Sequence, residues 1–184
     1  MKKFLGIFYF FIAQVAQAND APTLLIQGGL GLSHMGGLPE HYTTERVGAV
    51  LPLELKFELT PHVYAGVNYL LDSHGYTDAG DGEIDRKIDS RVRFVDLTIK
   101  GDAIGRVSPY GFVGLGRARM IEYGGEYGGA AVDIVDDVEL LGAGLFFGMD
   151  GAGSYHALEL SSVFYDRSEL VSTHLVYKYG WRFD

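Results

Sequence analysis

Leu170–Phe183 reads LVSTHLVYKYGWRF, and this stretch decides the fold. Its residues alternate between two faces, which is typical of a β-strand because successive Cβ atoms point to opposite sides. Aromatic side chains close one face at the end of the stretch: Tyr177, Tyr179, Trp181 and Phe183. Tyr and Trp favour the boundary between an apolar layer and water. The stretch therefore predicts the last strand of a transmembrane β-barrel, with these side chains at the membrane interface.

The N-terminus, MKKFLGIFYFFIAQVAQA, has the pattern of a secretory signal peptide. Lys2 and Lys3 form a basic start, an apolar run follows, and Ala16-Gln17-Ala18 is a small-x-small cleavage site. A membrane-spanning helix is the alternative, but it needs about 20 apolar residues and this run is shorter. We therefore expect residues 1–18 to be removed and residues 19–184 to form one domain in the envelope.

Composition narrows the function. The chain has no Cys, which excludes a lipid-anchored lipoprotein, disulfides and thiolate metal sites. Removing the leader removes two Lys and no acidic residue, so the formal net charge of −9 becomes −11. Nucleic acid needs a basic surface, so it is excluded as a partner. No cofactor motif is found.

Seven further alternating segments precede the last one. They are 23–33, 46–59, 62–72, 91–100, 110–120, 138–149 and 155–165. The connections 34–45, 73–90 and 121–137 are long and share one end with the short connection 167–169, whereas the turns at 60–61, 101–108 and 150–154, at the other end, are short. Outer-membrane barrels have long external loops and short periplasmic turns. The sequence therefore predicts an all-β fold, an eight-stranded antiparallel up-and-down transmembrane β-barrel.

Two Gly-rich strands and the aromatic terminal strand carry a family resemblance. SPYGFVGLGRA at 108–118 and LLGAGLFFGM at 140–149 resemble small eight-stranded outer-membrane barrels of the OmpA/OmpX type. The resemblance implies a monomer in the outer membrane of a Gram-negative cell. In that family a terminal Phe is read by the barrel assembly machinery, whereas here Asp184 follows Phe183.

Charged residues gather on the faces that we expect to point into the lumen. They are Glu54, Lys56, Glu58, Arg93, Asp96, Lys100, Arg117, Arg119, Glu159, Lys178 and Arg182. The lumen of an eight-stranded barrel is just wide enough for side chains to fill it. Buried ions cost several kcal/mol unless they are paired. We therefore predict a closed salt-bridged plug; a narrow gated ion path is the alternative.

The loop HGYTDAGDGEIDRKIDSR holds a weak candidate for a metal site. Asp78, Asp81 and Asp85 are closely spaced carboxylates of the kind that binds Ca²⁺ or Mg²⁺, but their spacing does not match an EF-hand. A solvated acidic loop is the favoured interpretation. A bound divalent ion would bridge the loop to phosphorylated outer-leaflet lipid.

A second resemblance gives the alternative function. His34 after the first strand and Asp72-Ser73 after the third resemble the arrangement in the outer-membrane lipid A palmitoyltransferase. The resemblance implies His34 as base, Ser73 as the hydroxyl nucleophile and Asp72 as the orienting carboxylate. That family also has an amphipathic helix before the barrel and a lumen that admits an acyl chain. Here the first strand starts soon after the cleavage site, and the expected lumen is charged.

The favoured function is non-enzymatic. Recognition usually resides in loops on a rigid scaffold. We therefore expect the long external loops to serve envelope integrity or surface interaction, in contact with outer-membrane lipid, lipopolysaccharide or an extracellular partner. The loop aromatics that could supply contact area are Tyr42, Tyr76, Tyr123 and Tyr127.

Overall fold

The computed structural model describes residues 23–37, 42–43, 47–78, 84–124, 130–149 and 153–183. The predicted signal peptide, residues 1–18, lies outside these ranges. In the part of the chain that is described, no helix is long and apolar enough to cross a membrane. The described elements are strands: β1 (Leu24–Gly36), β2 (Tyr42–Thr43), β3 (Gly48–Thr60), β4 (Val63–Asp78), β5 (Ile84–Lys100), β6 (Val107–Gly124), β7 (Ala130–Phe147), β8 (Gly153–Tyr165) and β9 (Val171–Phe183).

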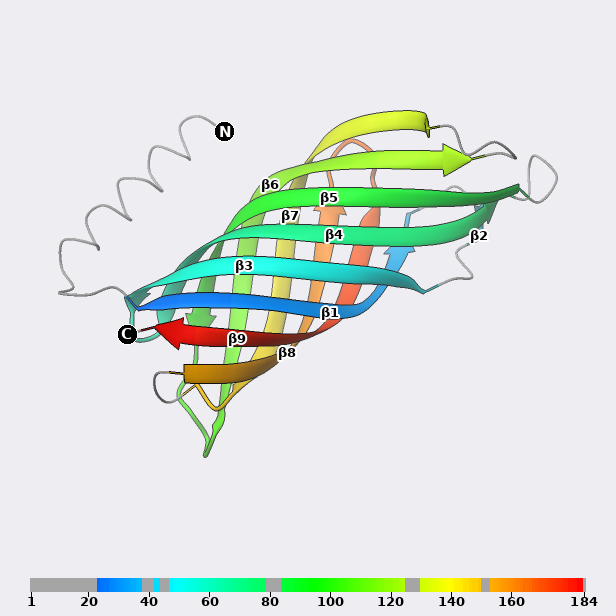
Figure 1. Ribbon diagram of the computed structural model, residues 1–184. Helices are drawn as coiled ribbons and strands as arrows, with labels where there is room; N and C mark the ends of the chain where they lie inside the picture. Colours follow the sequence, from blue (N-terminus) through cyan, green and yellow to red (C-terminus); the bar gives the residue numbers. More distant parts are fainter. Residues whose placement is uncertain are drawn as a thin grey trace.

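The long strands close into a barrel (Figure 1). They pair in the order β4-β3-β1-β9-β8-β7-β6-β5, and a further pairing of β4 with β5 closes the ring. All of these pairs are antiparallel. The two-residue β2 pairs with the far end of β4, outside the closed ring. The predicted eight-stranded antiparallel barrel is therefore confirmed.

The strands are staggered around the barrel. A row of ladder partners starts at Leu24 of β1 and crosses the other strands in turn through Phe57, Ala65, Leu97, Val113, Leu141, Ser162 and Thr173. Thr173 in turn pairs with His34, so the row returns to β1 ten residues beyond its start. Such a stagger requires strands that are tilted from the barrel axis by about 35–45°. Residues in one row therefore lie at different heights in the membrane.

Two predicted external loops are largely strand, so the expected boundaries were wrong there. β4 and β5 pair as far as Asp78 and Ile84, and β6 and β7 pair as far as Tyr123 and Ala130. Figure 1 shows β4 and β5 extending beyond β3. Backbone groups of the two hairpin arms satisfy one another, so pairing continues beyond the predicted strand ends, and Tyr76 and Ile88 are still buried there. Apolar and polar residues do not alternate regularly in segments 73–90 and 121–137, which hid these extensions in the sequence.

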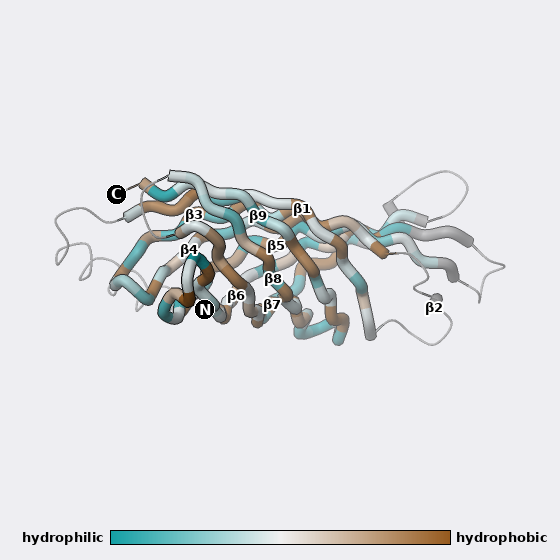
Figure 2. The backbone as a smooth tube through the Cα atoms, turned by 90° about the horizontal axis from the view of Figure 1, so that it is seen from below, coloured by the Kyte–Doolittle hydropathy of each residue, from teal (hydrophilic) through white to brown (hydrophobic). Residues whose placement is uncertain are grey.

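The two surfaces of the barrel wall differ in polarity. Figure 2 shows hydrophobic and hydrophilic residues alternating along the strands. Large apolar side chains face outward, among them Leu30 at 67% exposure and Leu160 at 58%. They occur on all eight long strands, forming a band far larger than the few hundred Å² of apolar patch that a soluble monomer exposes. The outer surface therefore suits hydrocarbon as its solvent.

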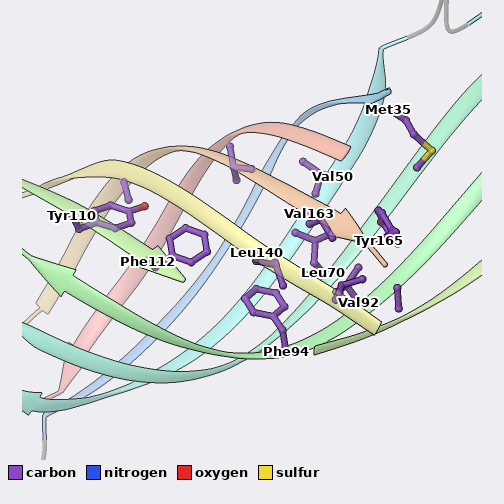
Figure 3. Packing of buried hydrophobic residues seen from close by; sticks show 14 of the residues in the cluster. Met35, Val50, Leu70, Val92, Phe94, Tyr110, Phe112, Leu140, Val163 and Tyr165 are labelled. Carbon is purple, nitrogen blue, oxygen red and sulfur yellow. The ribbon is translucent and has the colours of Figure 1, made fainter. Parts of the chain in front are cut away.

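Aromatic side chains fill part of the interior (Figure 3). Tyr110 and Phe112 point inward from β6, where their ladder partners on β7 are Gly144 and Gly142. A Cβ at Gly142 would lie 2.3 Å from the Phe112 ring, and one at Gly144 would lie 2.6 Å from the Tyr110 ring. Glycine on β7 thus makes the space that these two rings occupy. The same arrangement orients the odd-numbered residues of β6 outward.

Candidate functional site

The middle of the lumen holds a network of buried charges. Its members come from four strands, and we call Glu54, Lys56, Asp96, Glu159 and Lys178 the lumen network. Lys56 Nζ donates a 2.7 Å hydrogen bond to Asp96 Oδ2 and lies 3.3 Å from Glu54 Oε2. Lys178 Nζ donates to both Glu54 and Glu159. Alternating positive and negative groups therefore join β3, β5, β8 and β9 across the lumen.

Neutral polar side chains complete the hydrogen bonding of the lumen network. Asn68 Nδ2 donates to Asp96 Oδ1 at 2.6 Å, and Tyr110 OH donates to Glu159 Oε2 at 2.8 Å. Gln27 donates to Glu54 and accepts a 2.9 Å hydrogen bond from Tyr155. Because buried ion pairs are stable only when their remaining lone pairs and protons are satisfied, these contacts are what make the charges tolerable.

The Phe112 ring packs against both lysines of the lumen network. Lys56 Nζ lies 5.3 Å and Lys178 Nζ 5.8 Å from its centroid, within the range of cation–π attraction. The ring therefore adds cation–π attraction to the ion pairs that hold the two ammonium groups.

A second buried cluster lies nearer the external end. We call Asp72, His74, Ser172 and His174 the Asp72 cluster; all four side chains are buried. Asp72 Oδ2 lies 2.6 Å from Ser172 Oγ, 2.8 Å from His74 Nε2 and 3.1 Å from His174 Nε2. One carboxylate oxygen thus collects three donors from β4 and β9, which are not neighbours in the barrel wall.

The Asp72 cluster does not have the geometry of a catalytic triad. In a triad, one imidazole nitrogen contacts the carboxylate and the other contacts the hydroxyl. Here Nε2 of His174 faces both Asp72 and Ser172, and Nε2 of His74 does the same. Neither ring can therefore relay a proton between the two groups through its two nitrogens. The geometry fits a structural tie between strands.

Sequence reasoning missed His74, Ser172 and His174 as partners of Asp72. A signal was present, because Asp72 and His74 share one face of a strand, and Ser172, His174 and Lys178 share one face of another. The single sequence held no information that would bring these two faces together across the lumen.

The periplasmic end holds a third contact. Arg182 Nη2 lies 3.4 Å from Glu58 Oε2, and Arg182 Nη1 donates to the carbonyl oxygen of Met149. Both charged side chains are mostly buried. Lys100, also expected in the lumen, lies half-exposed at the end of β5.

Three residues expected in the lumen lie on the outer surface, so the prediction was wrong for Arg93, Arg117 and Arg119. Arg117 Nε contacts Asp137 Oδ1 at 3.0 Å, and Arg119 pairs with Asp133. For Arg117 and Arg119 the cause is which face of β6 points inward. Because Tyr110 and Phe112 occupy the lumen, Arg117 and Arg119 share the opposite face with Val113 and Leu115.

The alternative catalytic group is not assembled. His34 is exposed on the outer face of β1, whereas Asp72 is buried in the lumen and Ser73, its neighbour on β4, lies on the opposite face. Asp72 therefore cannot orient an imidazole for Ser73, and the prediction of a His34–Asp72–Ser73 site is wrong in its geometry.

The candidate metal site falls mostly outside the described side chains. Asp78 ends β4 and Asp85 lies in β5, but only their backbone is described, and Asp81 lies outside the described residues. Among the described residues, no group of three or more His, Cys, Asp or Glu side chains is arranged to hold a metal ion. The loop proposal thus stays a prediction.

The interface aromatics lie on the outer surface near the end of β9. Tyr177, Tyr179, Trp181 and Phe183 are all exposed there. The Tyr179 and Trp181 rings meet edge to face with centroids 4.5 Å apart, and His156 of β8 contacts Tyr177. Among the loop aromatics, Tyr76 is buried and its hydroxyl donates to Glu122, so it offers no free contact area. Only the backbone of Tyr42 is described, and Tyr127 lies outside the described residues.

Solved structures share this architecture. The attachment invasion locus protein Ail of Yersinia pestis, solved in complex with the heparin analogue sucrose octasulfate, matches with a TM-score of 0.61 and 16% identity over 88% of this chain and 99% of that one. Neisserial surface protein A matches with a TM-score of 0.58 and 10% identity over 87% and 97%. This chain has the fold of the small eight-stranded outer-membrane β-barrels.

A third structure of this kind is the N-terminal β-barrel domain of Pseudomonas aeruginosa OprF, with a TM-score of 0.52 and 14% identity over 86% of this chain and 97% of that one. Neither a family model nor a curated protein matches the sequence. At these identities the structural similarity shows the fold alone, so function has to be argued from the side chains of this chain.

Proposed function

We propose that the mature chain, residues 19–184, is a non-enzymatic integral protein of the Gram-negative outer membrane. Its barrel is a non-conducting anchor, and its external strand extensions act in envelope integrity or surface interaction. The observation that carries the proposal is the lumen network, in which five buried charges from four strands contact one another across the lumen. The lumen of an eight-stranded barrel is just wide enough for side chains, so a paired network of this kind leaves little room for ions, and the loss of one partner would destabilise the barrel.

The outer surface supports the membrane location. Exposed Leu, Val, Ile and Phe side chains cover the wall, and Tyr179 and Trp181 lie where the strands end. Export through the predicted signal peptide and recognition of the C-terminal strand by the barrel assembly machinery would bring the chain there as a monomer. Lipid and lipopolysaccharide are then its immediate neighbours.

Planar bilayers test the plug. The refolded wild-type protein is expected to give no large, steady single-channel conductance, because the paired side chains of the lumen network occupy the middle of the lumen. A steady conductance of the wild type would overturn the proposal. Heat-modifiable migration on a gel shows in the same sample that the barrel is folded, so absent conductance cannot come from unfolded protein.

A hairpin variant tests the external part. Residues 75–87 are replaced by a short turn, which leaves the pairing of β4 and β5 from His74 and Ile88 toward the periplasm in place. We expect this barrel to fold but to fail to restore detergent resistance or surface binding to cells that lack the protein. Full restoration by the variant would contradict a role for the extension.

Lipid A from the same cells tests the enzymatic alternative. Mass spectrometry is expected to give the same acyl-chain pattern with the wild type and with Ser73→Ala, because Asp72 and Ser73 face opposite sides of β4. An acyl chain that is added or removed by the wild type and not by Ser73→Ala would overturn the non-enzymatic assignment.

A further inference from the structure

Four arginines lie together on the outer surface of β5 and β6. Arg91 is the ladder partner of Arg119, and Arg93 is the ladder partner of Arg117. All four are exposed; we call them the arginine patch. Like charges directly opposite each other in a sheet destabilise the pairing. Four neighbouring guanidinium groups therefore require anions nearby.

The protein supplies anions for only half of the arginine patch. Arg119 binds Asp133 with two nitrogens, at 3.0 and 2.6 Å, and Arg117 contacts Asp137. Arg91 and Arg93 have no carboxylate partner within the described residues; Arg93 lies 6.0 Å from the Tyr69 ring centroid. Glu139, on the outer face of β7, is the ladder partner of Leu115 and so lies below the patch. The chain as a whole is acidic, so this basic surface is a local exception.

The stagger of the barrel gives the height of the arginine patch. A row of partners runs from Gly28 through Leu53 and Tyr69 to Arg93. Over the eight strand-to-strand steps of one full turn, such a row rises by the equivalent of ten residues along β1. Arg93 is three steps from Gly28, so it lies about four residues higher than Gly28, level with Leu32. Leu32 is about 20 Å above Leu24 for a strand that rises about 3.3 Å per residue and is tilted by about 40°. The apolar band of such barrels is about 25 Å tall, so Arg93 and Arg117 lie at its external edge.

Below the patch the outer surface of β5 and β6 is apolar, and Glu139 lies beside it on β7. On β5 it carries Val95, Leu97 and Ile99, and on β6 it carries Val113 and Leu115. A ligand that fills both regions has an anionic head and hydrocarbon chains. Because a guanidinium binds phosphate oxygens through paired N–H groups, phosphate is the head group that fits best.

We propose that the arginine patch binds the phosphate groups of an outer-leaflet glycolipid whose acyl chains lie against β5 and β6. Arg91 and Arg93 supply the free guanidinium groups, and the salt-bridged Arg117 and Arg119 extend the positive surface. The inference rests on the proposed membrane location and names the lipid chemistry that the barrel selects.

Native mass spectrometry tests the site. The full mature protein in neutral detergent is mixed with bis-phosphorylated lipid A or with its dephosphorylated form. We expect the wild type to retain the phosphorylated lipid at least about tenfold better, since losing a single charge-assisted hydrogen bond weakens binding by about a factor of ten or more. Equal retention of the two lipids would overturn the proposal.

Matched variants locate the binding. Arg91→Gln with Arg93→Gln should abolish the preference for phosphorylated lipid. The control is Lys87→Gln with Arg106→Gln, which removes the same amount of charge from two exposed residues outside the patch: a lysine paired with Asp89 and an arginine in the turn after β5. This control should keep the preference for phosphorylated lipid. Equal loss in both double variants would reveal general charge attraction and refute a site. If the Gln double variant fails to fold, Arg91→Lys with Arg93→Lys keeps the charge and should still weaken retention, because Lys lacks the planar fork.

A comparison of thermal stability distinguishes lipid phosphate from free inorganic phosphate. Inorganic phosphate alone should not raise the temperature at which the folded gel band is lost, whereas phosphorylated lipid A should. An equal shift with both would indicate a small-anion site and overturn the lipid part of the proposal. The folded gel band and the absence of conductance report on the proposed function separately, so its failure is distinguishable from failure of this site.

Discussion

The hydroxyl of Ser172 on β9 donates a 2.6 Å hydrogen bond to Asp72 Oδ2 on β4, 100 residues away in the sequence. The two strands are separated by β3 and β1 in the wall, so the bond crosses the lumen. It ties the last strand to the first half of the chain near the external end. Removal of either partner therefore acts on barrel closure.

Asp72→Ala should strongly destabilise the barrel. The substitution leaves Ser172, His74 and His174 without their shared acceptor, and a buried unsatisfied donor costs about 1–3 kcal/mol. We expect a total loss of about 3 kcal/mol or more in urea unfolding. Ser73→Ala, one position away on the outer face, is the control and should change the midpoint little. Equal effects of the two substitutions would contradict the cluster as a tie.

Lys56→Met and Arg117→Met separate the lumen from the outer surface. Lys56→Met leaves Asp96 as a buried carboxylate without its cation, which typically costs about 3–5 kcal/mol, and leaves Glu54 with Lys178 alone. Arg117→Met removes an exposed pair and should cost at most about 1 kcal/mol. Unfolding free energies measured in the same detergent compare the two. Similar costs would mean that the lumen network does not support the fold.

Gly144→Ala should destabilise the barrel because the methyl group would collide with Tyr110 and with the carbonyl oxygen of Leu158, 2.5 Å away. Overpacking of this kind costs about 1–3 kcal/mol. Gly111→Ala is the control on the neighbouring strand, since its Cβ would meet its nearest atom at an ordinary 3.7 Å. A Gly144→Ala barrel as stable as Gly111→Ala would show that the Tyr110 ring moves aside.

The barrel was predictable from alternation alone, but the direction of each face was not. On β3 and β9, charged residues alternate with apolar ones, so Glu54, Lys56 and Lys178 were assigned to the lumen and the structure places them there. On β6, aromatic residues stand on one face and two arginines on the other. Polarity suggested the wrong direction there, because the space for Tyr110 and Phe112 is created by glycines on a different strand.

The candidate site was predictable only in part for the same reason. Alternation within one strand shows directly which charged residues share a face. The partners across the lumen depend on the stagger of ten residues and on closure of β4 with β5. His74 and His174 therefore had no visible relation, and the exposed arginine patch arose from two strands whose register was unknown.

Trp181 is the only tryptophan, so its fluorescence reports on one place in the membrane. It is exposed on the outer surface near the end of β9, where interfacial aromatics lie. In vesicles, we expect lipids brominated near the head group to quench its emission more strongly than lipids brominated near the chain end. Strong quenching by aqueous acrylamide with none by brominated lipid would contradict this orientation.

Asp136 should make the turn after β8 sensitive to acid. It is buried, and it accepts hydrogen bonds from the N–H groups of Arg167 and Ser168 and from the Ser168 hydroxyl. Burial opposes ionisation, but these hydrogen bonds outweigh it and hold the pKa of Asp136 below its ordinary value. A carboxyl whose pKa is lowered by folding contributes stability above its unfolded pKa of about 3.9 and loses it as pH falls through the folded value.

The wild type should therefore be more stable than Asp136→Asn near neutral pH, and the gap should close as the pH falls below about 4. Urea midpoints of the two proteins across this range measure the gap. Asp166→Asn changes an exposed carboxyl in the same turn and should follow the wild-type profile. A gap between wild type and Asp136→Asn that persists undiminished at about pH 2 would show that the hydrogen bonds to Asp136 do not depend on its charge.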